Sequence, residues 1–255
     1  MNEKTENNSV NRSKKIYFAA DVHLGLQAGT NAAERENAFV QWLDTIKTDA
    51  ETIFLLGDIF DFWFEYKYVV PRGFTRVLGK IAEITDSGIA VHFFTGNHDM
   101  WTFNYLETEV GLIIHKKPAE ITLHGKKFFI AHGDEFGKND KSYKFLKKIF
   151  ACKFFQRCFA FLHPRTGMGI ARAWSKHSRL SKGLSETFDE NTDNLLAFAK
   201  QKLANEDIDF FVFGHRHTPI QLQLKDNCMF TIVGEWIKGR EYAVFDGENI
   251  IMLKQ

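Results

Sequence analysis

The sequence predicts an α/β sandwich that carries its functional side chains at the ends of strands. Short apolar runs recur along the chain, and each ends in a polar loop that contains glycine; they occupy residues 16–20, 52–57, 89–94, 126–131 and 209–213. Runs of this length are typical of buried strands. The segments 32–47 and 72–86 between them have helical periodicity. Open α/β sheets bind ligands beyond the carboxyl ends of their strands, so we expect the chemistry in these loops.

The chain after Pro219 has a different pattern. It contains four short alternating runs, IQLQLK, CMFTIVG, REYAVFDG and NIIML, which predict a closing antiparallel sheet. The first fifteen residues are polar and rich in Asn, Lys and Glu, and we expect a disordered lead-in over 1–15. Residues 16–255 are then predicted to form one domain with an insertion.

The composition is ordinary for a folded protein with a real core, with 44% apolar and 25% charged residues. No uninterrupted apolar run approaches the roughly 20 residues that a membrane-spanning helix needs, so we expect no such helix. The cysteines form an odd set without a C-x-x-C pair: Cys152, Cys158 and Cys228. This set argues against a disulfide framework and a structural zinc site, and the expected location is a reducing cytoplasm.

A strongly basic segment spans residues 138–182. It holds twelve lysine or arginine residues against one acid, Asp140, and therefore carries a formal charge of +11. The rest of the chain carries −10, because the whole chain has a net charge of +1. An acidic body with a basic segment of distinct composition indicates an inserted element that needs its own explanation.

Five strand-end loops carry residues of the kind that bind divalent metal ions. In chain order the motifs are D-x-H, G-D, G-N-H-D, H-G-D and G-H-x-H, and the candidate ligands are Asp21, His23, Asp58, Asn97, His132, His215 and His217. They offer oxygen and imidazole nitrogen atoms and no thiolate. This mixture suits manganese, iron, magnesium or zinc in a paired site better than a thiolate zinc centre.

Two cations in one site need a ligand that bridges them. A carboxylate suits this role because each of its two oxygens can serve one metal, and Asp58 is the candidate. Glycines stand beside Asp58, Asn97, His132 and His215, since a turn without a Cβ brings a ligand close to a crowded centre. Two such cations could share a water molecule and lower its pKa.

The five motifs are weak singly, because a lone D-x-H or H-x-H also occurs in ordinary polar turns. Their order and content together resemble the calcineurin-like metallophosphoesterases, from residue 16 to the end of the chain. The resemblance implies a four-layer α/β/β/α sandwich and a hydrolase with two divalent metal ions. It assigns one metal to Asp21, His23, Asp58 and His217, and the other to Asp58, Asn97, His132 and His215.

His98 stands inside the G-N-H-D motif, between Asn97 and Asp99. We expect His98 and Asn97 to bind the substrate phosphoryl group and to act as the catalytic residues that stabilise its oxygens. The adjacent Asp99 carboxylate could orient the imidazole ring. The alternative is a loop histidine that caps a helix beginning near Met100. The other carboxylates of these loops are expected to support them rather than to bind metal: Asp61, Asp99 and Asp134.

Residues 138–183 predict a helical hairpin inserted as a lid, with an HPRTG break between two helix-like stretches. Phenylalanines interleave with lysines, and the apolar side chains cover more than one helix face, which exceeds what docking on one side demands. The physical match is an anionic amphiphile or an anionic lipid surface. A core-packing hairpin with a solvated basic face is the alternative. A nucleic-acid groove also combines basic and aromatic residues, but phenylalanine favours lipid over bases.

Within the calcineurin-like group, this insertion after H-G-D resembles the UDP-2,3-diacylglucosamine diphosphatases of bacterial lipid A synthesis. Asp140 and Tyr143 have the spacing of that family's substrate contacts, and SKHSRLSK places Ser175 and Lys182 at its other substrate positions. The resemblance implies hydrolysis of the pyrophosphate of UDP-2,3-diacylglucosamine, giving UMP and 2,3-diacylglucosamine 1-phosphate. It also implies two Mn²⁺ ions as cofactors and an acylated UDP-glucosamine as the substrate.

The chain departs from the best-known branch at His98, where that branch has Arg, and at Arg179, where it has a small polar residue. These differences indicate a divergent branch with altered head-group contacts. The expected partner is an anionic membrane surface at the cytoplasmic face of a bacterial inner membrane, with no nucleic acid and no obligate protein partner. Two alternatives stay open: another calcineurin-like esterase acting on a nucleotide, lipid pyrophosphate or RNA, and an inactive scaffold that docks through the basic lid.

Overall fold

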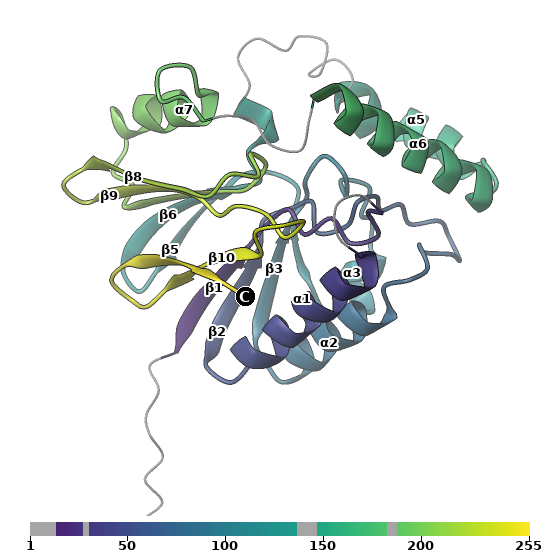
Figure 1. Ribbon diagram of the computed structural model, residues 1–255, viewed down its shortest axis with the longest axis horizontal. Helices are drawn as coiled ribbons and strands as arrows, with labels where there is room; N and C mark the ends of the chain where they lie inside the picture. Colours follow the sequence, from purple (N-terminus) through teal and green to yellow (C-terminus); the bar gives the residue numbers. More distant parts are fainter. Residues whose placement is uncertain (1–13, 28–30, 137–146, 183–187) are drawn as a thin grey trace, which may run out of the picture.

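Two β-sheets packed face to face form the centre of the computed structural model (Figure 1). The structure describes residues 14–27, 31–136, 147–182 and 188–255, so the lead-in predicted over 1–15 lies almost wholly outside it. The first sheet has the strand order β11-β10-β1-β2-β3-β4. Its strands are β1 (Lys15–Ala19), β2 (Ala50–Leu55), β3 (Ala90–Phe94), β4 (Ile113–His115), β10 (Glu241–Phe245) and β11 (Ile250–Lys254).

The second sheet has the strand order β5-β6-β7-β9-β8. Its strands are β5 (Ala119–Leu123), β6 (Lys126–Ala131), β7 (Phe210–Phe213), β8 (Ile220–Lys225) and β9 (Cys228–Ile232). Strands β1 to β4 run parallel in the first sheet, as do β6, β7 and β9 in the second. The carboxyl ends of parallel strands meet at one edge of a sheet. The loops after β1, β2, β3, β6 and β7, which carry the candidate ligands, therefore converge.

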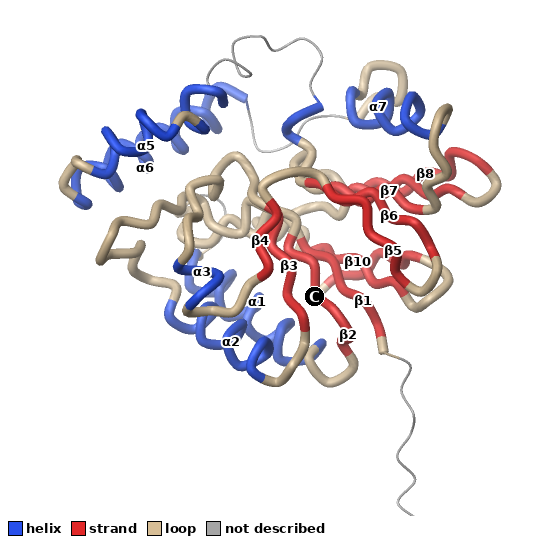
Figure 2. The backbone as a smooth tube through the Cα atoms, turned by 180° about the vertical axis from the view of Figure 1, so that it is seen from behind, coloured by secondary structure: helices blue, strands red, loops and turns tan. Residues whose placement is uncertain are grey.

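Helices cover the outer face of each sheet. The helices α1 (Ala32–Ile46) and α2 (Thr75–Asp86) pack on the first sheet, and α7 (Asn194–Leu203) packs on the second. Figures 1 and 2 show α1 and α2 on one side of the sheets and α7 on the other. The predicted four-layer α/β/β/α sandwich is therefore confirmed. The remaining short elements of the described body are α3 (Tyr105–Thr108) and the 3-10 helix η1 (Asp134–Phe136).

The strands after Pro219 correct one sequence prediction. They pair antiparallel, as expected, but they do not form one closing sheet. The β8–β9 pair extends the second sheet, whereas β10 and β11 form the edge of the first, where β10 pairs with β1. The alternating pattern specifies which residues of a strand face the core, and it carries no information about which of two sheets the strand joins.

Aromatic rings fill the space between the two sheets. Phe18 stacks on Phe54 with ring centroids 5.1 Å apart, and Phe128 stacks on Phe210 at 4.7 Å. Phe245 meets Phe128 edge to face at 5.0 Å. This core is closed to solvent, and it fixes the distance between the sheets whose loops form the candidate site.

The inserted hairpin lies over the loops at the carboxyl ends of the first sheet (Figures 1 and 2). Its helices are α5 (Lys153–Ala160) and α6 (Pro164–Lys182), preceded by a short helical stretch at 147–151. Phe159 of α5 packs against Phe64 at 4.7 Å and Trp101 at 4.8 Å between ring centroids. None of the helices in the described ranges is long and apolar enough to span a membrane.

Two phenylalanines provide a test of this packing. Phe128 is fully buried between the sheets, whereas Phe161 at the end of the hairpin is 90% exposed. Phe128→Ala should lower the free energy of unfolding by about 3 to 5 kcal/mol, because it removes a large side chain from a close-packed core. Phe161→Ala should change it by less than about 0.5 kcal/mol. Urea unfolding measures both, and similar losses for the two variants would contradict this core assignment.

Candidate metal centre

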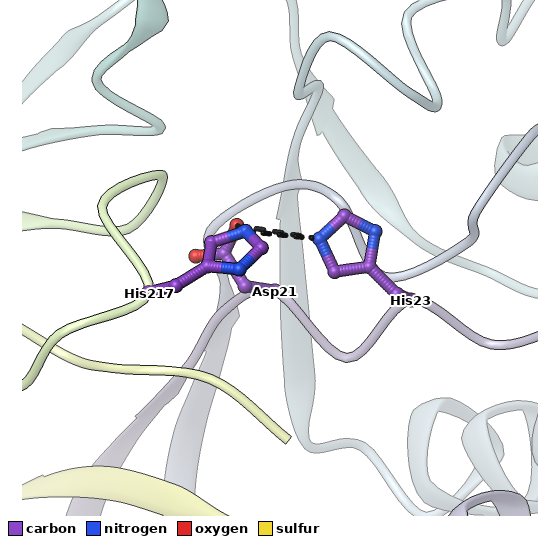
Figure 3. Close-up of side chains that lie close together, drawn as sticks. All are labelled: Asp21, His23 and His217. Carbon is purple, nitrogen blue, oxygen red and sulfur yellow. Dashed lines mark hydrogen bonds and ion pairs between the residues drawn. The ribbon is translucent and has the colours of Figure 1, made fainter. Parts of the chain in front are cut away.

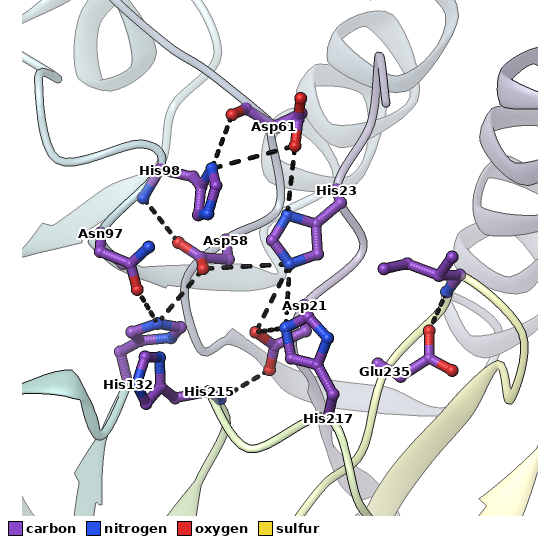
Figure 4. A network of polar contacts seen from close by, with 12 residues as sticks. Asp21, His23, Asp58, Asp61, Asn97, His98, His132, His215, His217 and Glu235 are labelled. Carbon is purple, nitrogen blue, oxygen red and sulfur yellow. Dashed lines mark hydrogen bonds and ion pairs between the residues drawn. The ribbon is translucent and has the colours of Figure 1, made fainter. Parts of the chain in front are cut away.

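The predicted ligands from both sheets lie together in two groups of metal-binding atoms. One group contains Asp21, His23 and His217 (Figure 3), and the other contains Asp58, His132 and His215 (Figure 4). Within each group the candidate ligand atoms all lie within 4.8 Å of one another. Loops from different sheets contribute to each group, so the centre depends on how the two sheets are packed.

The first group surrounds a buried carboxylate oxygen. Oδ1 of Asp21 lies 3.3 Å from Nε2 of His217 and 3.8 Å from Nε2 of His23, and the two Nε2 atoms are 3.2 Å apart. The other oxygen, Oδ2, accepts a hydrogen bond from the backbone N–H of His215 at 2.7 Å. Asp21 therefore faces one group of ligands and also ties the G-H-x-H loop of the second sheet to the first.

The second group centres on the imidazole of His132. Its Nδ1 donates to the backbone oxygen of Leu56 at 2.7 Å, which leaves Nε2 directed at the centre. Nε2 lies 3.5 Å from Oδ2 of Asp58 and 3.4 Å from Oδ1 of Asn97. The ring of His215 is 5.0 Å from that of His132. Asn97, predicted as a ligand on this side, thus lies beside His132 as the sequence suggested.

Asp58 occupies the position between the two groups. Its Oδ2 atom is 3.9 Å from Nε2 of His23 and 3.5 Å from Nε2 of His132, so one oxygen faces both groups. Its Oδ1 atom accepts a hydrogen bond from the backbone N–H of His98 at 2.8 Å. The position fits the predicted bridging ligand, and the expectation that each oxygen serves one metal stays a prediction.

The backbone at these loops is strained. Seven non-glycine residues of the described chain have positive φ, and five of them are candidate ligands: Asp21, His23, Asp58, His215 and His217. This region costs a residue with a Cβ free energy of order 1 to 3 kcal/mol. Such strain persists only where the surrounding structure enforces it. It indicates that the loops are built to direct these side chains rather than to reach their own lowest energy.

Two glycines make the approach of these loops possible. A Cβ on Gly96 would overlap Oδ1 of Asp58 and lie 2.5 Å from its backbone nitrogen. A Cβ on Gly57 would lie 2.7 Å from Nδ1 of His132. The G-D and G-N-H-D loops are therefore in contact through their backbones, and the G-D loop lies against the ring of His132, so the role predicted for these two glycines is confirmed.

Charges at the centre divide its histidines into two kinds. Burial lowers the pKa of His23 and of His215 to about 4, so both rings are neutral and can bind a cation. Burial would also lower the pKa of His132, but the carboxylate of Asp58 outweighs it and raises the pKa to about 10. Asp21 likewise raises the pKa of His217 against the effect of burial. In each group the carboxylate thus raises the pKa of one imidazole.

The residues fit two divalent cations. Asp21 and Asp58 are 0% and 2% exposed, and a buried carboxylate needs a positive partner. Among the described residues, Oδ1 of Asp21 and Nδ1 of His217 have no hydrogen-bond partner although both atoms are buried. A proton on His132 balances the Asp58 carboxylate, and a cation bound there would replace it. The ligand assignments themselves remain predictions.

The supporting carboxylates correct the account of His98. Asp99 does not touch that ring; its oxygens accept hydrogen bonds from the backbone N–H groups of Gly96, Asp58, Ile59 and Phe60. Asp61 lies beside His98 instead, because its backbone oxygen is 2.9 Å and its Oδ1 atom 3.9 Å from Nδ1. No helix begins near Met100, so the capping alternative for His98 is wrong. The sequence did carry a signal for the contact of Asp61 with His98, because Asp61 stands three residues after Asp58 in the same loop.

The hydrogen bond of His98 fixes how its ring can act. A carbonyl oxygen only accepts, so Nδ1 of His98 carries the hydrogen in its contact with Asp61. The other nitrogen, Nε2, can then donate to a substrate only when the ring is doubly protonated.

The predicted lid contacts have different outcomes. Asp140 and Tyr143 lie outside the described residues. Lys182 is the last residue of α6, and its proposed substrate contact stays a prediction. Ser175 is 4% exposed, and its hydroxyl lies 3.0 and 3.1 Å from the two oxygens of Asp61. Asp134 of the H-G-D loop pairs with Lys147 at 2.8 Å, so it supports the loop, as expected, and also joins it to the insertion.

Gly96→Ala should disable the centre, because the new Cβ requires Asp58 to move. Displacement of a catalytic group by about 1 Å can cost on the order of 10²-fold, so we expect a loss of that size in kcat on a small phosphodiester together with weaker metal binding. Gly79→Ala on α2 is the matched control, since its Cβ would meet no atom within 4 Å. Wild-type metal binding and turnover in Gly96→Ala would contradict the described geometry.

Metal binding should release protons. At neutral pH His132 carries a proton that a metal ligand must lose, so we expect release of about one proton per chain, and the raised pKa of His217 increases this release. The apparent affinity for metal should rise with pH through the neutral range and towards pH 10, the pKa of His132. An indicator dye in weak buffer measures the release, with His124→Gln, on the surface beside Glu51, as the control. Metal binding without proton release would contradict this charge distribution.

Comparison with known proteins agrees with the geometry. Residues 14–219 match the Calcineurin-like phosphoesterase family. The UDP-2,3-diacylglucosamine hydrolase of Porphyromonas gingivalis is 40% identical over 93% of this chain and 96% of its own. The enzyme of the same name from Histophilus somni is 28% identical over 88% of this chain and 92% of its own. Among solved structures, the phosphoesterase Yfce of E. coli aligns with a TM-score of 0.42 at 15% identity, covering 94% of this chain and 98% of its own. Since the family match spans most of its length, the chain belongs to the calcineurin-like phosphoesterase family.

Proposed function

We propose that this chain hydrolyses the pyrophosphate bond of UDP-2,3-diacylglucosamine and releases UMP and 2,3-diacylglucosamine 1-phosphate. It is a metal-dependent hydrolase by family, and the Porphyromonas gingivalis relative that is 40% identical has the corresponding name. The observation that carries the substrate assignment is the apolar surface of the inserted hairpin beside the metal centre. A lipid substrate explains why an exposed apolar surface lies on the hairpin that contacts the metal centre.

The large apolar residues of the hairpin divide into two sets. Phe159 packs on Trp101 and Phe64, and the backbone oxygen of Phe150 accepts a hydrogen bond from Nε1 of Trp101 at 2.8 Å. These residues dock the hairpin on the body. A second set is exposed to solvent: Phe154 at 66%, Phe155 at 47%, Phe161 at 90% and Ile170 at 51%. Core packing of the hairpin therefore accounts for only the first set.

The chain supplies the groups that act on the phosphoryl centre. When bound, two divalent cations would activate a water molecule and neutralise charge on the phosphoryl oxygens. Asn97 lies beside His132 at the centre, and Nε2 of His98 can donate to an oxygen of the transferring phosphoryl group when both ring nitrogens carry hydrogen. The phosphate that leaves from a pyrophosphate is a weak base, so protonation by His98 matters less than charge stabilisation.

Manganese is the proposed metal, because the centre offers carboxylate, amide and imidazole ligands without thiolate. The proposed location is the cytoplasmic face of a bacterial inner membrane. Exposed Phe154 and Phe161 stand on the same hairpin as Lys153, Arg157 and Arg165, a combination that suits an anionic lipid surface. The substrate contacts proposed for this lid are those implied by the family: Asp140, Tyr143, Ser175 and Lys182.

The experiment incubates the Mn²⁺-loaded protein with UDP-2,3-diacylglucosamine and identifies the products by mass spectrometry. UMP and diacylglucosamine 1-phosphate are expected, and UDP-glucose should be hydrolysed by orders of magnitude more slowly. Each buried methylene contributes about 0.8 kcal/mol to binding before ordering costs, and this binding energy appears in kcat/KM. Equal turnover of UDP-glucose, or no cleavage of the lipid, would overturn the assignment.

The same assay tests the lid. The double substitution of Phe154 and Phe155 by Ser should lower kcat/KM for the diacylated substrate by at least about tenfold, because both rings are exposed and available to acyl chains. Hydrolysis of a small phosphodiester should stay near wild type. Ile251→Ser on β11, with 45% exposure, is the control for loss of a surface apolar side chain. Equal loss on both substrates would mean that the rings stabilise the fold instead.

A further inference from the structure

A polar contact joins the inserted hairpin to a loop of the metal centre. The hydroxyl of Ser175 on α6 lies 3.1 Å from Oδ1 and 3.0 Å from Oδ2 of Asp61. Both side chains are buried, with 4% and 9% exposure. A buried carboxylate that accepts such a bond is held in one orientation. This contact joins the insertion to the G-D loop across 114 residues of sequence.

Asp61 lies behind two imidazoles of the centre (Figure 4). Its Oδ1 atom is 3.6 Å from Nδ1 of His23, while Nε2 of that ring faces Asp21 and His217. Its backbone oxygen accepts the hydrogen bond from Nδ1 of His98. One residue thus contacts the outer nitrogen of a candidate metal ligand and of the candidate catalytic histidine.

We propose that Ser175 is a positioning residue that couples docking of α6 to alignment of the metal centre. With α6 docked, the hydroxyl fixes the Asp61 carboxylate, and the Oδ1 atom of that carboxylate in turn fixes the ring of His23. With α6 displaced, the carboxylate loses the hydrogen bond from Ser175, and the ring of His23 loses a fixed partner. The centre is then fully aligned only under a docked lid. This inference rests on the proposed metal-dependent hydrolysis.

The structure separates this contact from the general docking of the hairpin. Phe159 and Trp101 hold the hairpin through apolar contacts that do not involve Ser175. Loss of the hydroxyl alone should therefore leave the hairpin docked. A partner that orients a metal ligand from outside typically contributes 10- to 100-fold to affinity or activity, and a residue one step further away should contribute less.

Ser175→Ala should lower kcat for bis(p-nitrophenyl) phosphate by about 3- to 10-fold with KM unchanged. This diester has no sugar or acyl chain, so a residue that only binds substrate would leave its hydrolysis intact. Calorimetry with Mn²⁺ should show a several-fold weaker affinity at one of two sites. Wild-type kcat and metal affinity would overturn the proposal, and so would a defect confined to KM for the diacylated substrate.

A pair of glycine variants in α6 tests the coupling without changing Ser175. A Cβ on Gly167 would overlap the hydroxyl of Tyr66 and lie 3.1 Å from the ring of Phe159, so Gly167→Ala should displace the helix. Gly169→Ala on the same helix meets no atom within 4 Å. Gly167→Ala should reproduce the kcat and metal-affinity losses of Ser175→Ala, and Gly169→Ala should behave as wild type. Faster proteolysis of the hairpin in Gly167→Ala without those losses would contradict the coupling.

A double variant establishes the order of the contacts. Asp61→Ala should lower metal affinity by about 10- to 100-fold, and Ser175→Ala should add no further loss in that background. Additive losses would show that Ser175 acts independently of Asp61 and overturn the relay. These readouts use Mn²⁺ and a small diester alone. Failure to cleave UDP-2,3-diacylglucosamine would therefore refute the proposed substrate and leave the coupling intact.

Discussion

Two buried carboxylates that need positive charge are the constraint on which the rest of this structure depends. Asp21 and Asp58 lie at the ends of neighbouring parallel strands, where solvent cannot neutralise them. Their loops therefore gather imidazoles from both sheets, and in each group the carboxylate raises the pKa of one ring. A pair of divalent cations satisfies the same requirement. The packing of the two sheets in the four-layer fold keeps these loops close enough for the carboxylates to contact the imidazoles.

The fold stabilises a local arrangement that is unfavourable by itself. Five candidate ligands have left-handed backbone angles, and Gly96 closes on Asp58 so tightly that no side chain fits. The aromatic core between the sheets offsets this strain, because it fixes the strands from which the loops emerge. The hairpin is joined to this centre by the contact of Ser175 on α6 with Asp61.

The centre was predictable from sequence because its residues follow parallel strands. Such strands all place their carboxyl ends at one edge, so motifs far apart in the chain, at Asp21, Asp58 and His132, must converge. The role of each supporting carboxylate was not predictable in this way. Asp99 adjoins His98 in sequence but turns to the backbone of the G-D loop, and Asp61 takes its place. The curvature of the loop decides this contact, and adjacency in the sequence does not encode it.

The same limit applies to the strands after Pro219 and to the hairpin. The alternation of apolar and polar residues predicted the strands. It did not predict how they divide between the two sheets, because both sheets have an apolar face on which such strands can pack. The phenylalanine content predicted an apolar hairpin, but not that Phe159 docks it while Phe154 and Phe161 remain exposed. That division depends on where Trp101 and Phe64 lie, which is a property of the tertiary structure.

The central claim, a paired metal centre bridged by Asp58, can be tested by anomalous X-ray diffraction from crystals grown with Mn²⁺. The account predicts two anomalous peaks per chain, about 4 Å apart. One should lie among Asp21, His23 and His217 and the other between His132 and His215, with Asp58 in contact with both. A single peak, or two peaks of which only one contacts Asp58, would contradict it.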